Sequence, residues 1–187
     1  SRATGIAIDV GIEHRWHHRH LQAPPAIMSK HTDPVFGVLD DDAHGYWSTI
    51  TKHGDLEVRT DLNIEGDIDI EQIRKFSDKL DDVAKFEALA RTAMLTDAEK
   101  KCSAVKTFRD RHAEFFDATE SETCMTTTKK DIGAFLQRCE LKRIALYPEC
   151  PGHCMILDFG FRAAVTDYML VVSFDDENRV VGVDMQR

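Results

Sequence analysis

Strict alternation of apolar and polar residues predicts a β-hairpin in the first half of the chain. In residues 56–64, one face of the expected strand holds Leu56, Val58, Thr60, Leu62 and Ile64, and the opposite face holds Glu57, Arg59, Asp61 and Asn63. Residues 46–52 alternate in the same way, which places Tyr46 and Trp47 on opposite faces. The turn signal His53-Gly54-Asp55 joins the two segments, so we expect an antiparallel hairpin. A short apolar run at 35–39 predicts a strand before it.

Apolar steps of three and four residues replace this alternation after residue 69 and predict helices. Asp69, with Gln72 three residues later, has the spacing of a capping box at a helix start. The apolar series then runs to Ala93 and fits either one long helix or two helices that separate near Asp81-Asp82.

The second half of the chain predicts two more helices followed by strands. Thr96 is expected to cap the first of these helices, and residues 129–139 form a shorter one. Apolar segments rich in branched residues then predict strands at 141–147, 155–159, 168–174 and 180–185. The fold class is therefore α+β, with a mainly antiparallel sheet (the N-terminal hairpin plus a C-terminal meander) and helices packed on one face.

Composition and charge narrow the classes of function. The chain has 187 residues, of which 42% are hydrophobic, and its 33 acidic and 24 basic residues give a net charge of −9. Negative charge repels phosphates, so we expect no direct binding to nucleic acid, and it favours a basic partner. No apolar run reaches the roughly 20 residues of a membrane helix, so we expect no membrane contact. The five cysteines lack a disulfide pattern, which favours a cytoplasmic location.

Residues 1–30 differ in composition from the rest of the chain. Four histidines lie close together there, at His14, His17, His18 and His20. No sustained helical or strand period follows, and Met28 resembles a natural start of translation. We interpret residues 1–30 as a leader or disordered N-terminal extension and residues 31–187 as a single α+β domain.

The loop Cys150-Pro151-Gly152-His153-Cys154 is the strongest candidate for metal or thiol chemistry. Two thiolates and an imidazole are zinc ligands, but a structural zinc site requires a fourth, and no second pair follows at comparable spacing. A Pro-Gly pair is also typical of a hairpin loop. His112 lies on an apolar helical stripe, as a hydrogen-bonded histidine at the core edge would. We therefore expect no metal, no cofactor and no catalytic residue.

An acidic run, Asp40-Asp41-Asp42, follows the first apolar segment. Solvated turn residues are the simplest interpretation of this run. The alternative is an acidic surface that covers the basic active site of a nuclease or similar toxin. Tyr46 and Trp47 lie just beyond it and are candidate aromatic anchors if they are exposed.

Five segments carry a family resemblance: 34–37, 62–66, 143–149, 157–160 and 166–175. In this order they resemble a bacterial family known as domain of unknown function two-thousand-four, over most of residues 31–187. The resemblance implies an α+β fold without an established activity. Similar small acidic proteins are often encoded beside secreted bacterial toxins, so it also implies an immunity protein. The loop at 150–154 and the glycine-free turn at 176–179 depart from the family pattern.

Together these features favour a non-catalytic binding protein, an immunity protein that neutralises a cognate secreted toxin, expected to be basic, by direct contact. We expect the contact at Asp40, Asp41, Asp42, Tyr46 and Trp47. If residues 46–52 lie at a sheet edge, they also offer a place for an added toxin strand. Two alternatives remain open: a metal-binding or thiol enzyme built on the loop at 150–154, and a homo-oligomeric scaffold.

Overall fold

The computed structural model describes residues 31–39, 45–65, 70–117, 129–161 and 167–187. The proposed leader at residues 1–30 lies outside this part of the chain. The elements follow in the order β1 (His31–Asp33), β2 (Gly37–Leu39), β3 (Tyr46–His53), β4 (Leu56–Asn63), α1 (Ile70–Leu80), α2 (Val83–Asp97), α3 (Ala104–Asp117), α4 (Lys129–Gln137), β5 (Cys139–Leu146), β6 (Met155–Phe161), β7 (Met169–Phe174) and β8 (Val180–Gln186).

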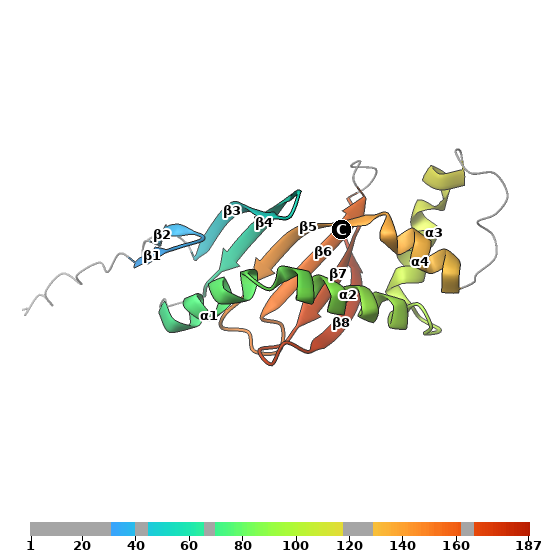
Figure 1. The fold of residues 1–187 in the computed structure, drawn as a ribbon. Coiled ribbons are helices and arrows are strands. Elements are labelled where there is room, and N and C mark those ends of the chain that lie inside the picture. Colours follow the sequence, from blue (N-terminus) through green and yellow to red (C-terminus); the bar gives the residue numbers. More distant parts are fainter. Residues whose placement is uncertain (1–30, 40–44, 66–69, 118–128, 162–166) are drawn as a thin grey trace, which may run out of the picture.

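The strands form a six-stranded sheet in the order β3-β4-β5-β6-β7-β8, and β1 and β2 form a separate two-stranded sheet (Figure 1). Neighbours in the large sheet are antiparallel except β4 and β5, which are parallel. The predicted α+β class, with an N-terminal hairpin and a C-terminal meander, is confirmed. The parallel pair that joins these two parts was not predicted.

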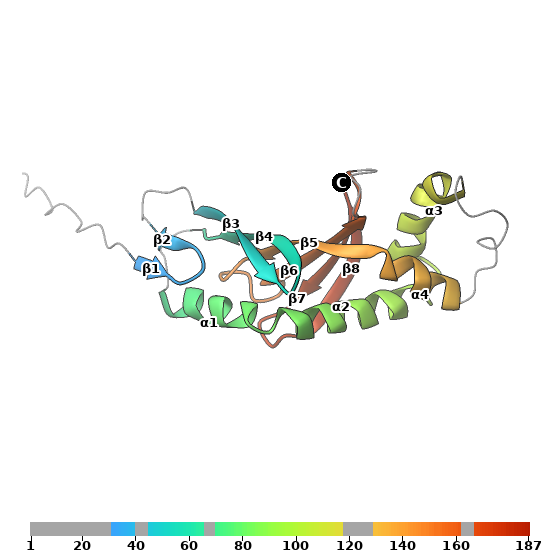
Figure 2. The same ribbon diagram turned by 45° about the horizontal axis from the view of Figure 1, so that its top comes forward.

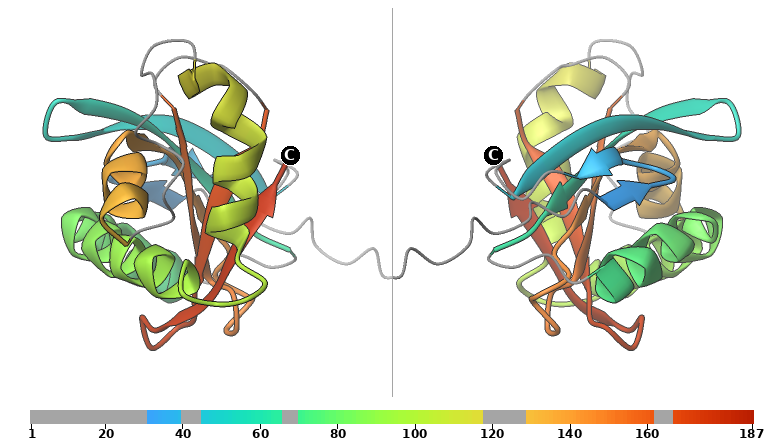
Figure 3. Two further views of the ribbon diagram at one scale, coloured as in Figure 1. Left: turned by 90° about the vertical axis from the view of Figure 1, so that its right-hand side faces the viewer. Right: turned by 90° about the vertical axis from the view of Figure 1, so that its left-hand side faces the viewer.

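Local sequence explains the β3–β4 hairpin, whose tip projects past the helices (Figure 3). Of the two loop residues, Gly54 alone has a positive φ, at 62°, as the first position of a type II′ turn requires. At the other end, Gly45 has a φ of 59°, and its carbonyl accepts a hydrogen bond from the Ile64 amide at 2.6 Å. A Cβ on Gly45 would lie 1.8 Å from the Ile64 carbonyl oxygen, so a larger residue would displace this strand end.

The core lies between the helices and one face of the large sheet. Figure 2 shows α1 and α2 running along that face, with α3 and α4 at one end of it. Strand residues with buried side chains on this face include Val58, Leu62, Ile144, Leu146, Leu157, Phe159, Leu170, Val172 and Phe174. They pack with helix residues such as Ile73, Phe76, Phe86, Met94, Val105 and Phe108 in one continuous cluster. Within the described residues, the other face of the sheet carries no helix.

Helix boundaries follow the predicted pattern in one place and depart from it in another. The expected break at Asp81-Asp82 separates α1 from α2. Thr96, however, lies inside α2 and does not cap α3. The cap belongs to Ser103, whose hydroxyl accepts a hydrogen bond from the Lys106 amide at 3.1 Å. The prediction was wrong because Thr96 belongs to the last turn of α2, which ends at Asp97, and α3 begins only at Ala104.

The β1–β2 hairpin is fixed to α1 by a buried carboxylate. Asp33, only 2% exposed, accepts hydrogen bonds at Oδ1 from the amides of Val35 (2.8 Å) and Phe36 (2.9 Å). The Ser77 hydroxyl on α1 donates to its Oδ2 at 2.7 Å. One side chain therefore closes the turn and joins it to the helix, which brings Leu39 of β2 into the core.

We expect Asp33→Ala to lower the free energy of unfolding by roughly 3 kcal/mol, because two backbone amides and a hydroxyl lose a charged acceptor. Ser77→Ala removes a single bond and is expected to cost about 1 kcal/mol. Urea denaturation followed by circular dichroism measures both. Thr32→Ala, at an exposed position of the same strand, is the control. Equal losses in all three variants would contradict this account of the hairpin.

Candidate functional site

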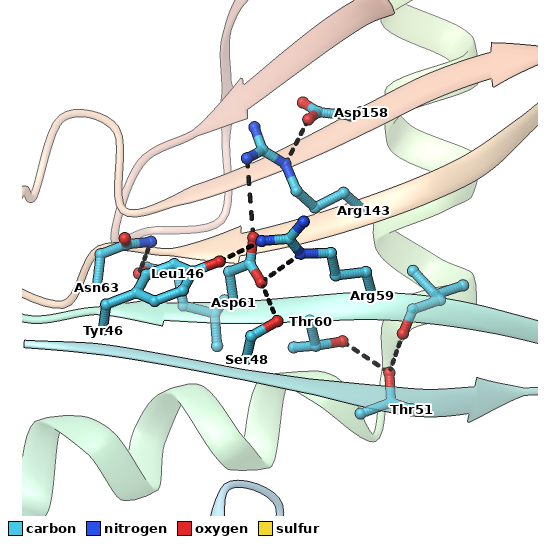
Figure 4. Close-up of polar contacts among 11 residues, drawn as sticks. Tyr46, Ser48, Thr51, Arg59, Thr60, Asp61, Asn63, Arg143, Leu146 and Asp158 are labelled. Carbon is cyan, nitrogen blue, oxygen red and sulfur yellow. Dashed lines mark hydrogen bonds and ion pairs between the residues drawn. The ribbon is translucent and has the colours of Figure 1, made fainter. Parts of the chain in front are cut away.

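A connected group of polar side chains lies on the helix-free face of the sheet. We call it the open-face network and define it as Tyr46, Ser48, Arg59, Asp61, Arg143 and Asp158 (Figure 4). Its members come from four neighbouring strands, β3, β4, β5 and β6. The ion pair between Arg143 and Asp61 joins strands that are far apart in sequence.

The strand registers explain how these residues meet. Ser48 pairs with Asp61, which pairs with Ala145 across the parallel β4–β5 contact. In the adjacent row, Arg59 pairs with Arg143, which in turn pairs with Asp158. Paired residues in a sheet point to the same face, so both rows face away from the helices. Ala145 contributes only a methyl group to the first of these rows.

Asp61 is the centre of the network. It is 1% exposed, although the alternation of β4 places it on the face predicted to be polar. Its Oδ1 accepts hydrogen bonds from the Ser48 hydroxyl at 2.7 Å and from Arg59 Nε at 2.9 Å, and its Oδ2 lies 3.7 Å from Arg143 Nη1. A buried carboxylate requires partners of this kind, because desolvation penalises an unpaired charge.

The second carboxylate, Asp158, is paired on one oxygen only. Arg143 Nε donates to its Oδ2 at 2.6 Å, whereas its buried Oδ1 has no hydrogen-bond partner in the described part of the chain. Burial raises the pKa of the Asp158 carboxyl above its ordinary value, and the Arg143 charge opposes that rise. Asp61 adds a smaller upward effect on the same pKa.

The network presents positive groups to solvent and hides its negative ones. The Arg59 and Arg143 side chains are 52% and 38% exposed, while their carboxylate partners lie beneath them. Tyr46 extends the network at the sheet edge, where its hydroxyl accepts a hydrogen bond from Arg59 Nη2. The arrangement provides guanidinium donors in fixed positions beside an aromatic ring, which suits recognition of carboxylates or carbonyl oxygens.

The predicted contact residues are placed unequally. Tyr46 is 46% exposed on the helix-free face. Trp47 points to the opposite face, where it is half-buried and packs against the core, so the exposure required of an anchor is not met. Asp40, Asp41 and Asp42 lie outside the described residues. Of the two predicted contact residues that the structure describes, Tyr46 is exposed on the helix-free face and Trp47 lies on the other face of β3.

The loop at 150–154 does not gather its reactive groups. Cys150 and His153 are exposed, whereas Cys154 is buried. Burial raises the pKa of the Cys154 thiol, which disfavours the nucleophilic thiolate, although Lys79 opposes that rise. Burial also raises the pKa of Cys139, in β5, to about 12. In the part of the chain that is described, no three His, Cys, Asp or Glu side chains are placed to hold a metal ion.

His112 has the structural environment expected of a core histidine. It is fully buried, and its Nδ1 lies 2.6 Å from the Phe108 carbonyl oxygen one turn earlier in α3. Its ring packs against those of Phe108 and Phe161, with centroid distances of 4.2 and 5.0 Å. The interpretation as a hydrogen-bonded core residue is confirmed.

Comparison with protein-family models, with curated proteins and with solved structures finds no match to this chain. None of the helices in the described ranges is long and apolar enough to cross a membrane. The family resemblance therefore stays a prediction.

Sequence reasoning did not find Ser48, Arg59, Asp61, Arg143 or Asp158 as a group. Two of them can be noticed in the sequence, because Arg143 and Asp158 are charged residues that each interrupt an apolar strand segment. Charged residues inside such strands require partners. The identity of those partners depends on the β4–β5 pairing, which the sequence pattern does not reveal. Arg143 and Asp158 also fall within the segments that carry the family resemblance.

The raised pKa of Asp158 predicts a specific dependence of stability on pH. The folded protein binds this proton more tightly than the unfolded chain, so stability falls as pH rises from the ordinary value of 3.8 through the folded-state pKa. Asp158→Asn has no proton to lose. We therefore expect the unfolding free energy of the wild type, relative to Asp158→Asn, to decrease as pH rises over this window. Urea denaturation between pH 4 and pH 7 tests this, and a relative free energy that stays constant or increases would refute it.

Thiol labelling tests the environment of the cysteines. With an aromatic disulfide reagent at pH 8, we expect Cys102 and Cys150, which are exposed, to react fast. Cys139 and Cys154 are buried and are expected to react only as fast as the fold opens. Peptide mapping assigns each label, and denatured protein provides the fully reactive control. Fast labelling of Cys154 in the folded protein would restore the thiol hypothesis.

Proposed function

We propose that the protein is a non-catalytic binding protein of the immunity type, which neutralises a cognate basic toxin in the cytoplasm by covering it. The observation that carries the proposal is the open face of the sheet. It is free of helices within the described residues and presents an organised polar network with an exposed tyrosine at its edge.

Pre-organisation supports a binding role for this face. Arg59 is held by Asp61 and Tyr46, and Arg143 is held by Asp61 and Asp158. Side chains that are already ordered lose less conformational entropy when a partner arrives, so more of the contact energy becomes affinity. Arginine and tyrosine are also the residue types that dominate binding energy at protein interfaces. A face built in this way suits tight binding without chemistry.

Charge supports the choice of partner. The net charge of −9 steers a basic protein toward this chain, whichever face it finally contacts. Asp40, Asp41 and Asp42 precede β3 by a few residues in sequence, and in this proposal they take part in the contact with the basic toxin. The guanidinium groups then fix the orientation by binding carboxylates or carbonyl oxygens of the toxin.

Tyr46→Ala is expected to weaken binding to the toxin by about tenfold or more, because it removes an exposed aromatic anchor beside Arg59. The toxin is first captured with the full chain as bait from the organism that encodes it. Calorimetry then measures the dissociation constant with each variant. Co-expression must also relieve the growth arrest that the captured protein causes, because capture alone does not demonstrate neutralisation.

Leu89→Ala is the matched control, because Leu89 is an exposed apolar residue of α2 in the helix layer. We expect this variant to bind and protect like the wild type. The proposal fails if the folded bait captures no toxic partner, or if Leu89→Ala weakens binding as much as Tyr46→Ala does.

A further inference from the structure

Among the described residues, the strand β3 ends the large sheet with an edge that no further strand covers. It has eight residues and pairs with β4 without any shift of register. No other strand in the described ranges is hydrogen-bonded to its outer side. Proteins usually protect such edges with proline, a bulge or inward-pointing charge, because an open edge recruits further strands. In β3, proline is absent and Lys52, near one end, is the only Lys, Arg, Asp or Glu residue.

The opposite edge strand, β8, shows the usual protection. A register shift lies between Ser173 and Phe174 where β7 meets β8, and Asp184 is exposed along the strand. The helices α2 and α3 also pack against β8. Of the two edge strands, β3 is therefore the one that lacks these forms of protection in the described part of the chain.

Hairpin geometry determines which backbone groups of β3 face outward. His53 and Leu56 close a two-residue loop and form a hydrogen-bonded pair, and such pairs alternate along an antiparallel ladder. Residues 47, 49 and 51 therefore bond to β4. Tyr46, Ser48, Ile50 and Lys52 direct their amides and carbonyls to the free edge. Their side chains lie on the open face.

The side chains of these residues form a pattern that is complementary to itself. Ile50 is 61% exposed and Tyr46 is 46% exposed, and they lie two residues on either side of Ser48. If β3 meets a second β3 in antiparallel orientation with Ser48 opposite Ser48, each Tyr46 lies opposite the Ile50 of the other copy. Aromatic and β-branched residues are a favourable cross-strand pair, and this pairing removes part of both exposed apolar side chains from solvent.

We propose that the protein forms a two-fold symmetric dimer in which β3 pairs with β3 of a second copy, with the axis at Ser48. The two six-stranded sheets then continue into each other. Opposed residues in an antiparallel ladder share a face, so the open faces of both copies lie on the same side. The inference goes beyond the proposed toxin-binding function and does not depend on it.

Light scattering of the purified full chain tests the dimer. We expect twice the 21.2 kDa chain mass for the wild type and 21.2 kDa for Ile50→Lys, because the substitution removes the apolar partner of both Tyr46 rings and places two positive charges in the small interface. Val38→Lys is the matched control, since Val38 is 56% exposed on β2, outside this edge, and this variant should stay dimeric. Circular dichroism confirms that each variant is folded. A wild type that is monomeric at every concentration overturns the proposal.

Cysteine cross-linking tests the position of the axis. Ser48→Cys places two thiols opposite each other and is expected to give a disulfide-linked dimer under mild oxidation, identified by peptide mapping. Lys52→Cys introduces a thiol on the same face of the same strand. Its two copies lie eight residues apart along the paired strands, roughly 27 Å at about 3.4 Å per residue, and should not cross-link to each other. Cross-linking at Lys52→Cys but not at Ser48→Cys overturns this register.

Discussion

The parallel pairing of β4 with β5 is the constraint on which the other features depend. Parallel neighbours cannot be joined by a tight turn, so the chain between them must cross over the sheet. Here that crossover contains all of α1 to α4. Because it leaves β4 and returns to the strand beside it, its helices pack on one face and build a single core there. As a consequence of the topology, no helix of the described ranges covers the opposite face.

The same pairing brings two positive charges together and places a carboxylate between them. Its register places Arg59 directly beside Arg143, and like charges at paired positions destabilise a sheet. Asp61, two residues from Arg59, lies within reach of both guanidinium groups and is buried by them. The β4–β5 pairing therefore requires the Asp61 carboxylate to offset the repulsion between the two arginines. In turn, Asp61 can be buried only because this pairing brings both arginines within its reach. The open-face network is in this sense part of the fold as well as a candidate site.

The sequence predicted the elements that depend on local pattern and missed those that depend on distant pairing. The β3–β4 hairpin, the break at Asp81-Asp82 and the meander follow from alternation, turn residues and helical spacing. The β4–β5 contact joins segments separated by four helices, so no local signal specifies it. Alternation assigned Asp61 to the correct face but implied exposure, because its covering side chains come from Arg59 and the distant Arg143. Of the two aromatic candidates, Tyr46 is exposed, as the prediction required, whereas Trp47 packs against the core.

The β3–β4 hairpin connects the open face with the free edge of the sheet. Tyr46 belongs to both, since its ring is exposed on the face while its backbone amide and carbonyl point outward at the edge. A symmetric pairing of β3 would leave the tyrosine on the surface and set the Ile50 of the other copy beside it. A toxin bound at Tyr46 would then contact both copies near the axis. Because two-fold symmetry repeats this contact, the stoichiometry of the complex would report whether two toxins fit across the axis or one excludes the other.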